Sequence, residues 1–310
     1  MATMTYATRE CETLDLSANG IDPITFRRLG GAFGAVVEGV DLASELSEAV
    51  QAALVRALDV HSLLCFPDQH LKPADQMRVV STFGEIGPRY AGVAPADGDW
   101  PDVRNLSNIV NSDGTRVGEA NMRGMEWHTD GSGFRHPNKA TTLYAVEVPE
   151  TGGETYFASG YLAYELLDAE TKALVDGMTC TFSWVTLQRW LAEADGDSSP
   201  LTPEQAAEFP DIRRPLVRAH PVTGRKALWF SIEEVIDIDG MGRERTREFL
   251  QGLLDRIMST QHVMYRHDWR LGDFVIWDNR CLLHSVSEYN YAGLRRHMQQ
   301  TNIADYSDPF

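Results

Sequence analysis

The amino-acid sequence predicts one β-rich domain of the α+β class, and three observations lead to this prediction. Many short apolar runs are bounded by glycine, proline, asparagine or aspartate, which is typical of strands joined by turns. A smaller number of segments carry apolar residues at helical spacing. No internal repeat and no linker divides the 310 residues. We therefore expect residues 1–310 to form a single domain of mixed strands and helices.

The first part of the chain is expected to hold a polar N-terminal arm at residues 1–22, followed by strands and helices. Ser47 precedes apolar residues at helical spacing and is the expected N-cap of a helix. Pro73 is expected in the first turn of a second helix, where proline's missing N–H costs nothing. The expected elements are strands within 24–40, a helix from 47, a buried strand over 63–66 and a helix over 73–83.

Residues 84–126 form a long segment that is rich in proline, glycine, aspartate and asparagine. Loops of this length inside a compact domain are usually functional. This one leads directly into Trp127 and the histidine that follows it. We therefore expect 84–126 to be a loop region of the active site.

Strands and helices continue through the rest of the chain. Gly152 and Gly153 are expected to form a turn between two strands. An acidic, turn-rich segment over 192–212 fits either a lid or a disordered surface loop, and the sequence leaves both open. The final strands carry His284 and the pair Arg295-Arg296. The other expected elements are strands over 141–146, 155–158, 216–219, 227–230 and 273–277, and helices over 160–175 and 243–260.

The most informative motif is His128-Thr129-Asp130, which has a partner far downstream in His284. In an extended segment residues i and i+2 point to the same side, so His128 and Asp130 could reach one ion. His284 follows a predicted buried strand and a turn, which could carry it back toward this pair. Two histidines and one carboxylate on one face of a metal are the ligand set of non-haem Fe(II) oxygenases.

The His-x-Asp motif alone is weak evidence. A chain with 9 histidines contains one by chance with a probability of about a half, so a surface histidine beside a solvated aspartate is the alternative. Trp127 and Phe134 favour the metal site, because they suggest an apolar wall that excludes bulk water. His220 is expected to order a turn, and His262 and His267 are not expected to be metal ligands, because neither has a carboxylate partner at ligand spacing.

The composition limits the classes of partner. A net charge of −17 argues against nucleic acid and against an anionic membrane surface. No apolar run approaches the length of a membrane span, and the N-terminus lacks the pattern of a signal peptide. The four cysteines show no disulfide or metal-binding spacing, which favours reduced thiols. We therefore expect a cytoplasmic protein that binds neither nucleic acid nor membranes.

A series of motifs runs along nearly the whole chain. The motifs are Gly31-Ala32-Phe33-Gly34-Ala35, Val40-Asp41-Leu42, Phe83-Gly84-Glu85, Trp127-His128-Thr129-Asp130, Gly152-Gly153-Glu154-Thr155, His220-Pro221, Gly224-Arg225, Trp277-Asp278-Asn279-Arg280, His284 and Arg295-Arg296. In their order and spacing these motifs resemble one family, the Fe(II)/2-oxoglutarate-dependent taurine and aryloxyalkanoate dioxygenases (TauD/TfdA). The resemblance implies a double-stranded β-helix, a cupin-like jelly roll, with flanking helices.

The resemblance also implies roles for individual residues. His128, Asp130 and His284 match the iron ligands of the family. Thr155 and Arg296 match the residues that hold the distal carboxylate of 2-oxoglutarate, and a guanidinium suits this role because it can bind a carboxylate through two hydrogen bonds. A shift of one residue in register would give this role to Arg295 instead, so Arg295 stays as an alternative. The implied cofactors and cosubstrates are Fe(II), 2-oxoglutarate and O₂.

One position departs from the family pattern. Taurine dioxygenase has an arginine for the substrate sulfonate four residues after its cosubstrate arginine, whereas this chain has Gln300 there. The departure argues against taurine as the substrate. An anionic substrate group would then need another partner, and the candidates are Arg89, Arg123 and Arg189. Tyr90 falls where relatives line the substrate pocket.

The function implied by the resemblance is oxidation of a small organic molecule at a C–H bond, with succinate and CO₂ as co-products. Hydroxylation is favoured, with desaturation, cyclisation or cleavage of a C–heteroatom bond as alternatives. Asp130 argues against halogenation, because halogenating relatives replace this ligand with a small residue. A non-catalytic binding or sensor protein and a metal-dependent hydrolase are the hypotheses from other classes. The family often forms dimers or tetramers, so a homo-oligomer is expected.

Overall fold

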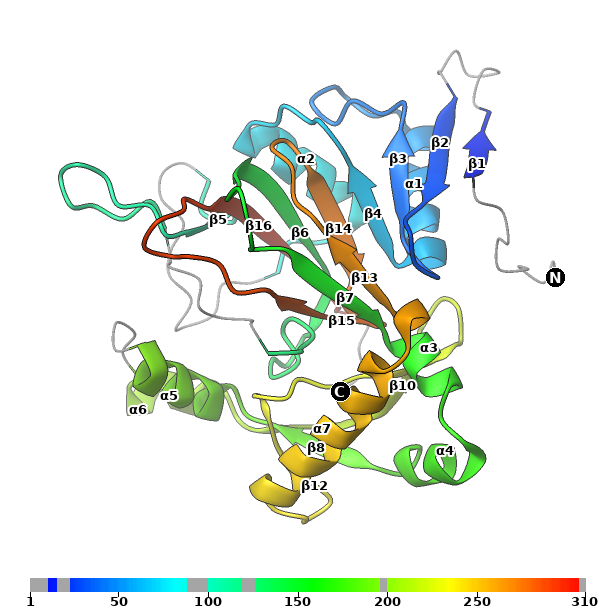
Figure 1. Ribbon diagram of the computed structural model, residues 1–310, viewed down its shortest axis with the longest axis vertical. Coiled ribbons are helices and arrows are strands. Elements are labelled where there is room, and N and C mark those ends of the chain that lie inside the picture. The colour runs from blue at the N-terminus through cyan, green and yellow to red at the C-terminus, as the bar shows by residue number, and fades with distance from the viewer. Residues whose placement is uncertain (1–10, 16–22, 88–99, 119–125, 196–199, 307–310) are drawn as a thin grey trace.

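The computed structural model describes residues 11–15, 23–87, 100–118, 126–195 and 200–306. A large sheet at its centre combines strands from the beginning, middle and end of the chain (Figure 1). Neighbouring strands in this sheet run antiparallel, except for one parallel pair between the third and fourth strands. In spatial order the strands are β1 (Cys11–Leu14), β2 (Ile24–Arg28), β3 (Ala35–Glu38), β4 (Leu63–Phe66), β14 (Phe274–Asp278), β6 (Asn138–Glu147), β16 (His297–Ala304) and β5 (Arg104–Ser107).

A second, smaller sheet packs against one face of the large sheet. It consists of β13 (Met264–His267), β7 (Thr155–Ser159) and β15 (Leu282–Val286), all antiparallel. Phe157 of β7 contacts Trp277 of β14, with ring centroids 5.3 Å apart. Both rings are fully buried and belong to one apolar cluster between the two sheets. Two antiparallel sheets packed in this way form the sandwich of a jelly roll.

Strand β14 supplies both faces of the large sheet, because successive side chains alternate across a strand. Val275 and Trp277 point into the sandwich core. Phe274 and Ile276 belong to a separate cluster with the buried faces of α1 (Glu48–His61) and α2 (Pro73–Phe83). Burial on both faces explains why this strand appears in the sequence as one continuous apolar run.

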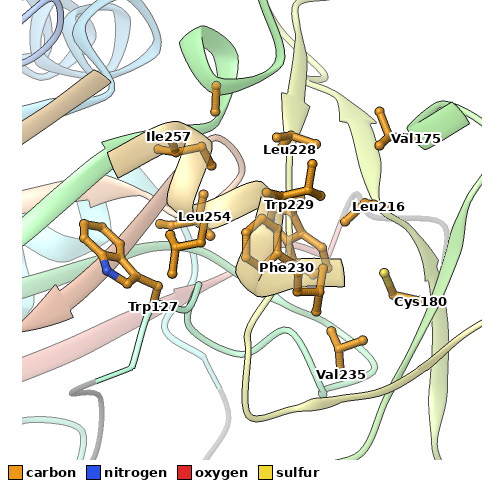
Figure 2. Close-up of a cluster of buried hydrophobic side chains, with 14 of the residues drawn as sticks. Trp127, Val175, Cys180, Leu216, Leu228, Trp229, Phe230, Val235, Leu254 and Ile257 are labelled. Atoms are coloured by element: carbon orange, nitrogen blue, oxygen red, sulfur yellow. The ribbon is translucent and has the colours of Figure 1, made fainter. Parts of the chain in front are cut away.

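The remaining elements form the lower part of the molecule in Figure 1, around a third apolar cluster. Figure 2 shows Trp229 and Phe230 at the centre of this cluster, beside Leu254 and Ile257 of a long helix. No described helix is long and apolar enough to cross a membrane. The elements are α3 (Gly160–Glu165), α4 (Ala169–Val175), β8 (Thr179–Phe182), α5 (Trp184–Asp195), α6 (Pro203–Ala207), β9 (Ile212–Pro215), β10 (Val217–Ala219), β11 (Lys226–Leu228), β12 (Val235–Ile238), α7 (Arg243–Met258) and η2 (Gln261–Val263).

Most expected elements are present, but the single helix predicted over 160–175 is wrong. The chain instead forms α3 and α4, with a break after Glu165. Asp168 causes a new start, because its side chain accepts a hydrogen bond from Thr171 N at 2.8 Å and acts as an N-cap. By contrast, α1 begins as predicted, with Ser47 Oγ accepting a hydrogen bond from Val50 N.

Two segments expected to be loops contain regular structure. Strand β5 lies within 84–126 and forms the edge of the large sheet through its pairing with β16. In 192–212, α5 extends to Asp195 and α6 follows, with Thr202 as its N-cap. Residues 88–99, 119–125 and 196–199 lie outside the described part of the chain. The function of 192–212 as a lid stays a prediction.

The turn between β14 and β15 is braced by a buried ionic cluster. Arg280 Nη2 lies 2.6 Å from Asp278 Oδ2 and 2.9 Å from Asp59 Oδ1, so α1 is tied to this turn. His220 Nε2 lies 3.0 Å from Asp278 Oδ2, and its Nδ1 accepts hydrogen bonds from two backbone N–H groups. Burial alone would raise the pKa of Asp278, but Arg280 and His220 hold it well below its usual range. The cluster therefore fixes the path of the chain into β15.

We predict that Arg280→Met will destabilise the protein by about 3–5 kcal/mol, because it leaves a fully buried carboxylate without its main counter-charge. Urea denaturation followed by circular dichroism measures this loss. The matched control is Arg256→Met, which removes a 63% exposed guanidinium and should change the free energy of unfolding by less than about 0.5 kcal/mol. Equal midpoints for the two variants would contradict the assigned role of the cluster.

Candidate active site

A short backbone pairing brings the two histidines of the predicted triad together. His128 and His284 form an antiparallel bridge, in which His128 N donates to His284 O at 3.0 Å and His284 N donates to His128 O at 2.8 Å. Their rings lie 4.1 Å apart, centroid to centroid. His284 is held by β15 in the small sheet, and Asp130 lies in the turn that follows His128.

The three candidate ligands converge on one point. Asp130 Oδ1 lies 3.5 Å from His128 Nε2 and 3.7 Å from His284 Nε2. One ligand atom from each residue lies within 4.8 Å of the other two. Separations of this size suit three ligands on one face of a metal ion, with its other positions open.

The hydrogen bonds of His128 show that this arrangement fits a cation. Its Nδ1 lies 2.8 Å from the carbonyl oxygen of Glu126, which can only accept, so Nδ1 carries the proton. The Nε2 lone pair then faces Asp130 Oδ1, and two such acceptors repel unless a positive charge lies between them. Burial opposes a second proton on His128, but Asp130 raises the pKa of this imidazole to about 9. A divalent cation would replace that proton.

The other two groups have the charge states that metal ligands require. Burial and the neighbouring His128 lower the pKa of His284 to about 3, so this imidazole is neutral at pH 7. Burial favours the protonated form of Asp130, but His284, His128 and Thr141 hold the pKa of Asp130 below its usual range. Once a cation replaces the second proton of His128, the triad offers two neutral imidazoles and one carboxylate.

Asn279 orients Asp130 through the hydroxyl group of Thr141. Thr141 Oγ1 donates to Asp130 Oδ2 at 2.6 Å, and Asn279 Nδ2 donates to Thr141 Oγ1 at 2.8 Å. The Asn279 side-chain oxygen accepts from Trp277 Nε1, and its backbone carbonyl accepts from Thr129 Oγ1 and Trp229 Nε1. These contacts join the large sheet and the lower core at one buried residue, and they restrict the orientation of the carboxylate.

Thr155 and Arg296 line the same pocket as the triad. Trp269 Nε1 donates to Thr155 Oγ1 at 2.9 Å, which leaves the threonine hydroxyl free to donate its own hydrogen. Arg296 immediately precedes β16, is only 4% exposed, and forms no ion pair with a carboxylate in the described part of the chain. Burial lowers the pKa of this guanidinium. A buried guanidinium without a protein counter-charge fits an anionic ligand.

The structure separates Arg295 from Arg296. Arg295 pairs with Glu147 at 2.6 Å, and its side chain is 62% exposed. A carbon added at Gly153 would lie 3.3 Å from Arg296 Cδ and Nε, so this glycine leaves room for the buried arginine. Of the two candidates for the cosubstrate carboxylate, only Arg296 lines the pocket.

The structure places only some of the predicted substrate residues at the pocket. Arg89, Tyr90 and Arg123 lie outside the described residues. Arg189 is exposed on α5 and does not line the pocket, whereas the preceding residue of the helix, Gln188, does. Gln300 lines the pocket and is 8% exposed.

Sequence reasoning missed four charged residues of the pocket, Asp102, Arg104, Glu233 and Glu234. Burial raises the pKa of Glu234 to about 7, although a hydrogen bond from Ser132 opposes this rise. Arg104 has a partner in the neighbouring strand, with its Nη1 donating to Gln300 Oε1 at 2.7 Å. The only signal in the sequence was that Arg104 falls inside the segment expected to be an active-site loop.

A second group of three possible metal ligands, Cys65, His267 and Asp273, lies in the sandwich core. His267 Nε2 is 3.2 Å from Asp273 Oδ2, and its Nδ1 lies 2.9 Å from Tyr265 Oη. Burial raises the pKa of Cys65 above its usual range, so its sulfur is a neutral thiol. Asp273 is a carboxylate partner of His267 that the spacing in the sequence did not reveal.

Comparisons with known proteins give a consistent assignment. The model of the family "Taurine catabolism dioxygenase TauD, TfdA family" matches residues 25–302. The (S)-phenoxypropionate/alpha-ketoglutarate-dioxygenase of Sphingobium herbicidovorans is 34% identical over 280 residues, covering 89% of this chain and 93% of that protein. The alpha-ketoglutarate-dependent 2,4-dichlorophenoxyacetate dioxygenase of Cupriavidus pinatubonensis is 28% identical, covering 88% and 95%.

Solved structures agree with these relatives. A crystal structure of AAD-2 with Mn(II) and N-oxalylglycine has a TM-score of 0.73 and 28% identity, covering 91% of this chain and 97% of that one. A taurine dioxygenase from Burkholderia xenovorans has a TM-score of 0.72 and 25% identity, covering 91% and 89%. These matches confirm the predicted fold class and the predicted reaction class, a dioxygenase that depends on Fe(II) and 2-oxoglutarate. The chain belongs to the TauD, TfdA family.

Proposed function

We propose that His128, Asp130 and His284 hold the iron ion, and that the enzyme hydroxylates a small organic acid. The observation that carries this assignment is the convergence of Nε2 atoms from two histidines on Asp130 Oδ1, at 3.5 and 3.7 Å. The hydrogen bond from His128 Nδ1 to Glu126 O turns the Nε2 lone pair toward the same point.

Thr155 and Arg296 bind the distal carboxylate of 2-oxoglutarate in this proposal. Both residues line the pocket, and both side chains carry hydrogen-bond donors. When bound, iron and cosubstrate together supply the oxidising power, as 2-oxoglutarate and O₂ become succinate and CO₂ and one oxygen atom enters the substrate. The protein orients the cosubstrate through the two donors and protects the site from bulk water.

An apolar wall of the pocket is suited to the body of the substrate. Phe134, Trp184, Leu187 and Leu191 line the pocket and form one buried cluster, in which the rings of Phe134 and Trp184 lie 4.6 Å apart. Two relatives are named for phenoxypropionate and 2,4-dichlorophenoxyacetate, which join an aromatic ring to a short acid. We therefore propose aryloxyalkanoic acids or acids of similar shape as substrates.

The proposed reaction replaces one C–H bond of the substrate with C–OH. Where the hydroxylated carbon also carries an ether oxygen, the product is a hemiacetal. It breaks at the C–O bond to give a carbonyl compound and an alcohol or phenol, with the hydroxyl proton moving to the leaving oxygen. A homodimer or tetramer and a cytoplasmic location stay predictions, and size-exclusion chromatography with light scattering tests the first.

We predict that His128→Ala will weaken Mn(II) binding by more than about 100-fold, because it removes one of three protein ligands from the ion. Mn(II) titration followed by electron paramagnetic resonance measures this without any turnover. His262→Ala is the matched control, since His262 is exposed on η2 and should leave the affinity unchanged. Unchanged Mn(II) affinity in His128→Ala would exclude this residue as a ligand.

We predict that Arg296→Met will weaken 2-oxoglutarate binding by about 10- to 100-fold, the usual effect of losing charge-assisted hydrogen bonds. Anaerobic titration of the Fe(II) protein measures this through the weak visible charge-transfer band. Arg295→Met removes the exposed neighbour and should leave the dissociation constant unchanged. If Arg295→Met weakens binding instead, the role belongs to Arg295.

We predict that 2-phenoxypropionate will stimulate succinate formation by the Fe(II) enzyme under O₂, and that taurine will not, because Gln300 replaces a charged donor. Succinate is quantified by chromatography against a reaction without substrate. Stimulation by taurine alone would contradict the proposed substrate class. Absence of both the visible band and succinate would contradict the proposed function itself.

A further inference from the structure

A pair of polar side chains lies at the edge of the large sheet where it lines the pocket. Arg104 of β5 and Gln300 of β16 are directly opposite in the antiparallel register. Arg104 Nη1 donates to Gln300 Oε1 at 2.7 Å. Side chains opposite each other on antiparallel strands are close enough to act together on one ligand. Both residues line the pocket that contains the proposed iron ligands.

The hydrogen bond between them fixes the orientation of the Gln300 amide. A guanidinium has only donors, so Gln300 must turn its oxygen toward Arg104. Its Nε2 then carries two N–H donors on the other side of the amide. Gln300 is 8% exposed, and no acceptor in the described part of the chain bonds to its Nε2. A buried amide with unused donors at a pocket wall indicates a ligand that accepts hydrogen bonds.

The position of Gln300 separates this pair from the cosubstrate arginine. Arg296 precedes β16, and Gln300 lies four residues further along, which corresponds to about 13 Å of extended chain. Both line the pocket. The pocket therefore has two guanidinium groups at separate positions, Arg296 and Arg104.

The acidic residues of the pocket restrict where a second anion can bind. Glu233 and Glu234 lie before β12, in the lower part of the molecule, and Ser132 donates a hydrogen bond to Glu234. Neither carboxyl group can supply a positive charge, so their side of the cavity offers no counter-charge to a second carboxylate. Asp102 lines the pocket two residues before Arg104. Among the described lining residues, Arg104 and Gln300 are the pair that combines a positive charge with unused amide donors.

We propose that Arg104 and Gln300 bind the carboxylate of the substrate and so determine the specificity of the enzyme for acids. This inference rests on the proposed function, and it names the residues that select the substrate. The guanidinium supplies charge, and the Gln300 amide supplies two directed N–H groups. The apolar cluster of Phe134 and Trp184 then receives the rest of the molecule.

The test compares 2-phenoxypropionate with its neutral amide, 2-phenoxypropanamide, on the Fe(II) and 2-oxoglutarate holoenzyme. We expect the wild type to prefer the acid by about 10- to 100-fold in kcat/KM for succinate formation, the range for losing charge-assisted hydrogen bonds. Arg104→Met should remove most of this preference by lowering kcat/KM for the acid alone. Gln300→Met should reduce it as well, and Arg104→Lys should restore only part of it, because lysine lacks the fork.

Binding without turnover gives an independent readout. The acid should perturb the visible band of the anaerobic wild-type complex, and Arg104→Met should need about 10- to 100-fold more acid for the same change. The affinity for 2-oxoglutarate should not change, which shows that the variant is folded and that Arg296 still acts. Arg256→Met, an exposed arginine that pairs with Asp168, is the matched control.

Three outcomes would overturn the inference. Equal kcat/KM values for the acid and the amide in the wild type would show that no residue recognises the carboxylate. An unchanged preference in both Arg104→Met and Gln300→Met would show that other residues do. Formation of the 2-oxoglutarate band without any response to the acid would remove the carboxylate assignment while the iron and cosubstrate site stands. Loss of the band in the wild type would instead contradict the proposed function, and this inference with it.

Discussion

The candidate active site depends on one short backbone pairing, the antiparallel bridge between His128 and His284. Two hydrogen bonds, of 3.0 and 2.8 Å, bring together residues that are far apart in the sequence. The pairing itself is weak, since it joins single residues rather than two strands. It persists because each partner is held elsewhere, His284 by its place in β15 and the segment of His128 by packing of Trp127 in the lower core. The geometry of the triad is therefore a property of the whole sandwich.

A buried hydrogen-bond network at Asn279 and Asp278 connects the rigid sandwich to the candidate site. Asn279 receives hydrogen bonds from Trp277 and Trp229 and passes one through Thr141 to Asp130. Such a buried network is stabilising only when all its members are satisfied, because an unpaired polar group in a low dielectric is costly. The partners of Asn279 come from the large sheet and from the lower core. This arrangement explains how a carboxylate can remain ionised and oriented beside two imidazoles before any cation binds.

The sequence was sufficient for features that depend on local chemistry and on order along the chain. The cap at Ser47, the buried run of β14 and the three candidate ligands follow from residue types and spacing. Features that depend on tertiary pairing could not be predicted in this way. The predicted helix over 160–175 is interrupted at Asp168, because a short polar side chain competes for backbone donors. Strand β5 was not predicted, because it lies in a segment of low apolar content. Arg104 was missed for the same reason, since only the register with β16 places it in the pocket.

The charge of the protein and the charge of its pocket lead to opposite expectations for an anionic substrate. A net charge of −17 repels anions at long range, but salt screens that field over about 8 Å at physiological ionic strength. Inside the pocket screening is weaker, and the nearest charges dominate. Arg296 is almost fully buried there, and Arg104 is partly buried on the neighbouring strand β5. In the proposed mode of binding, local guanidinium groups decide the affinity for acids, while the negative surface slows their approach and makes their association rate increase as salt is added.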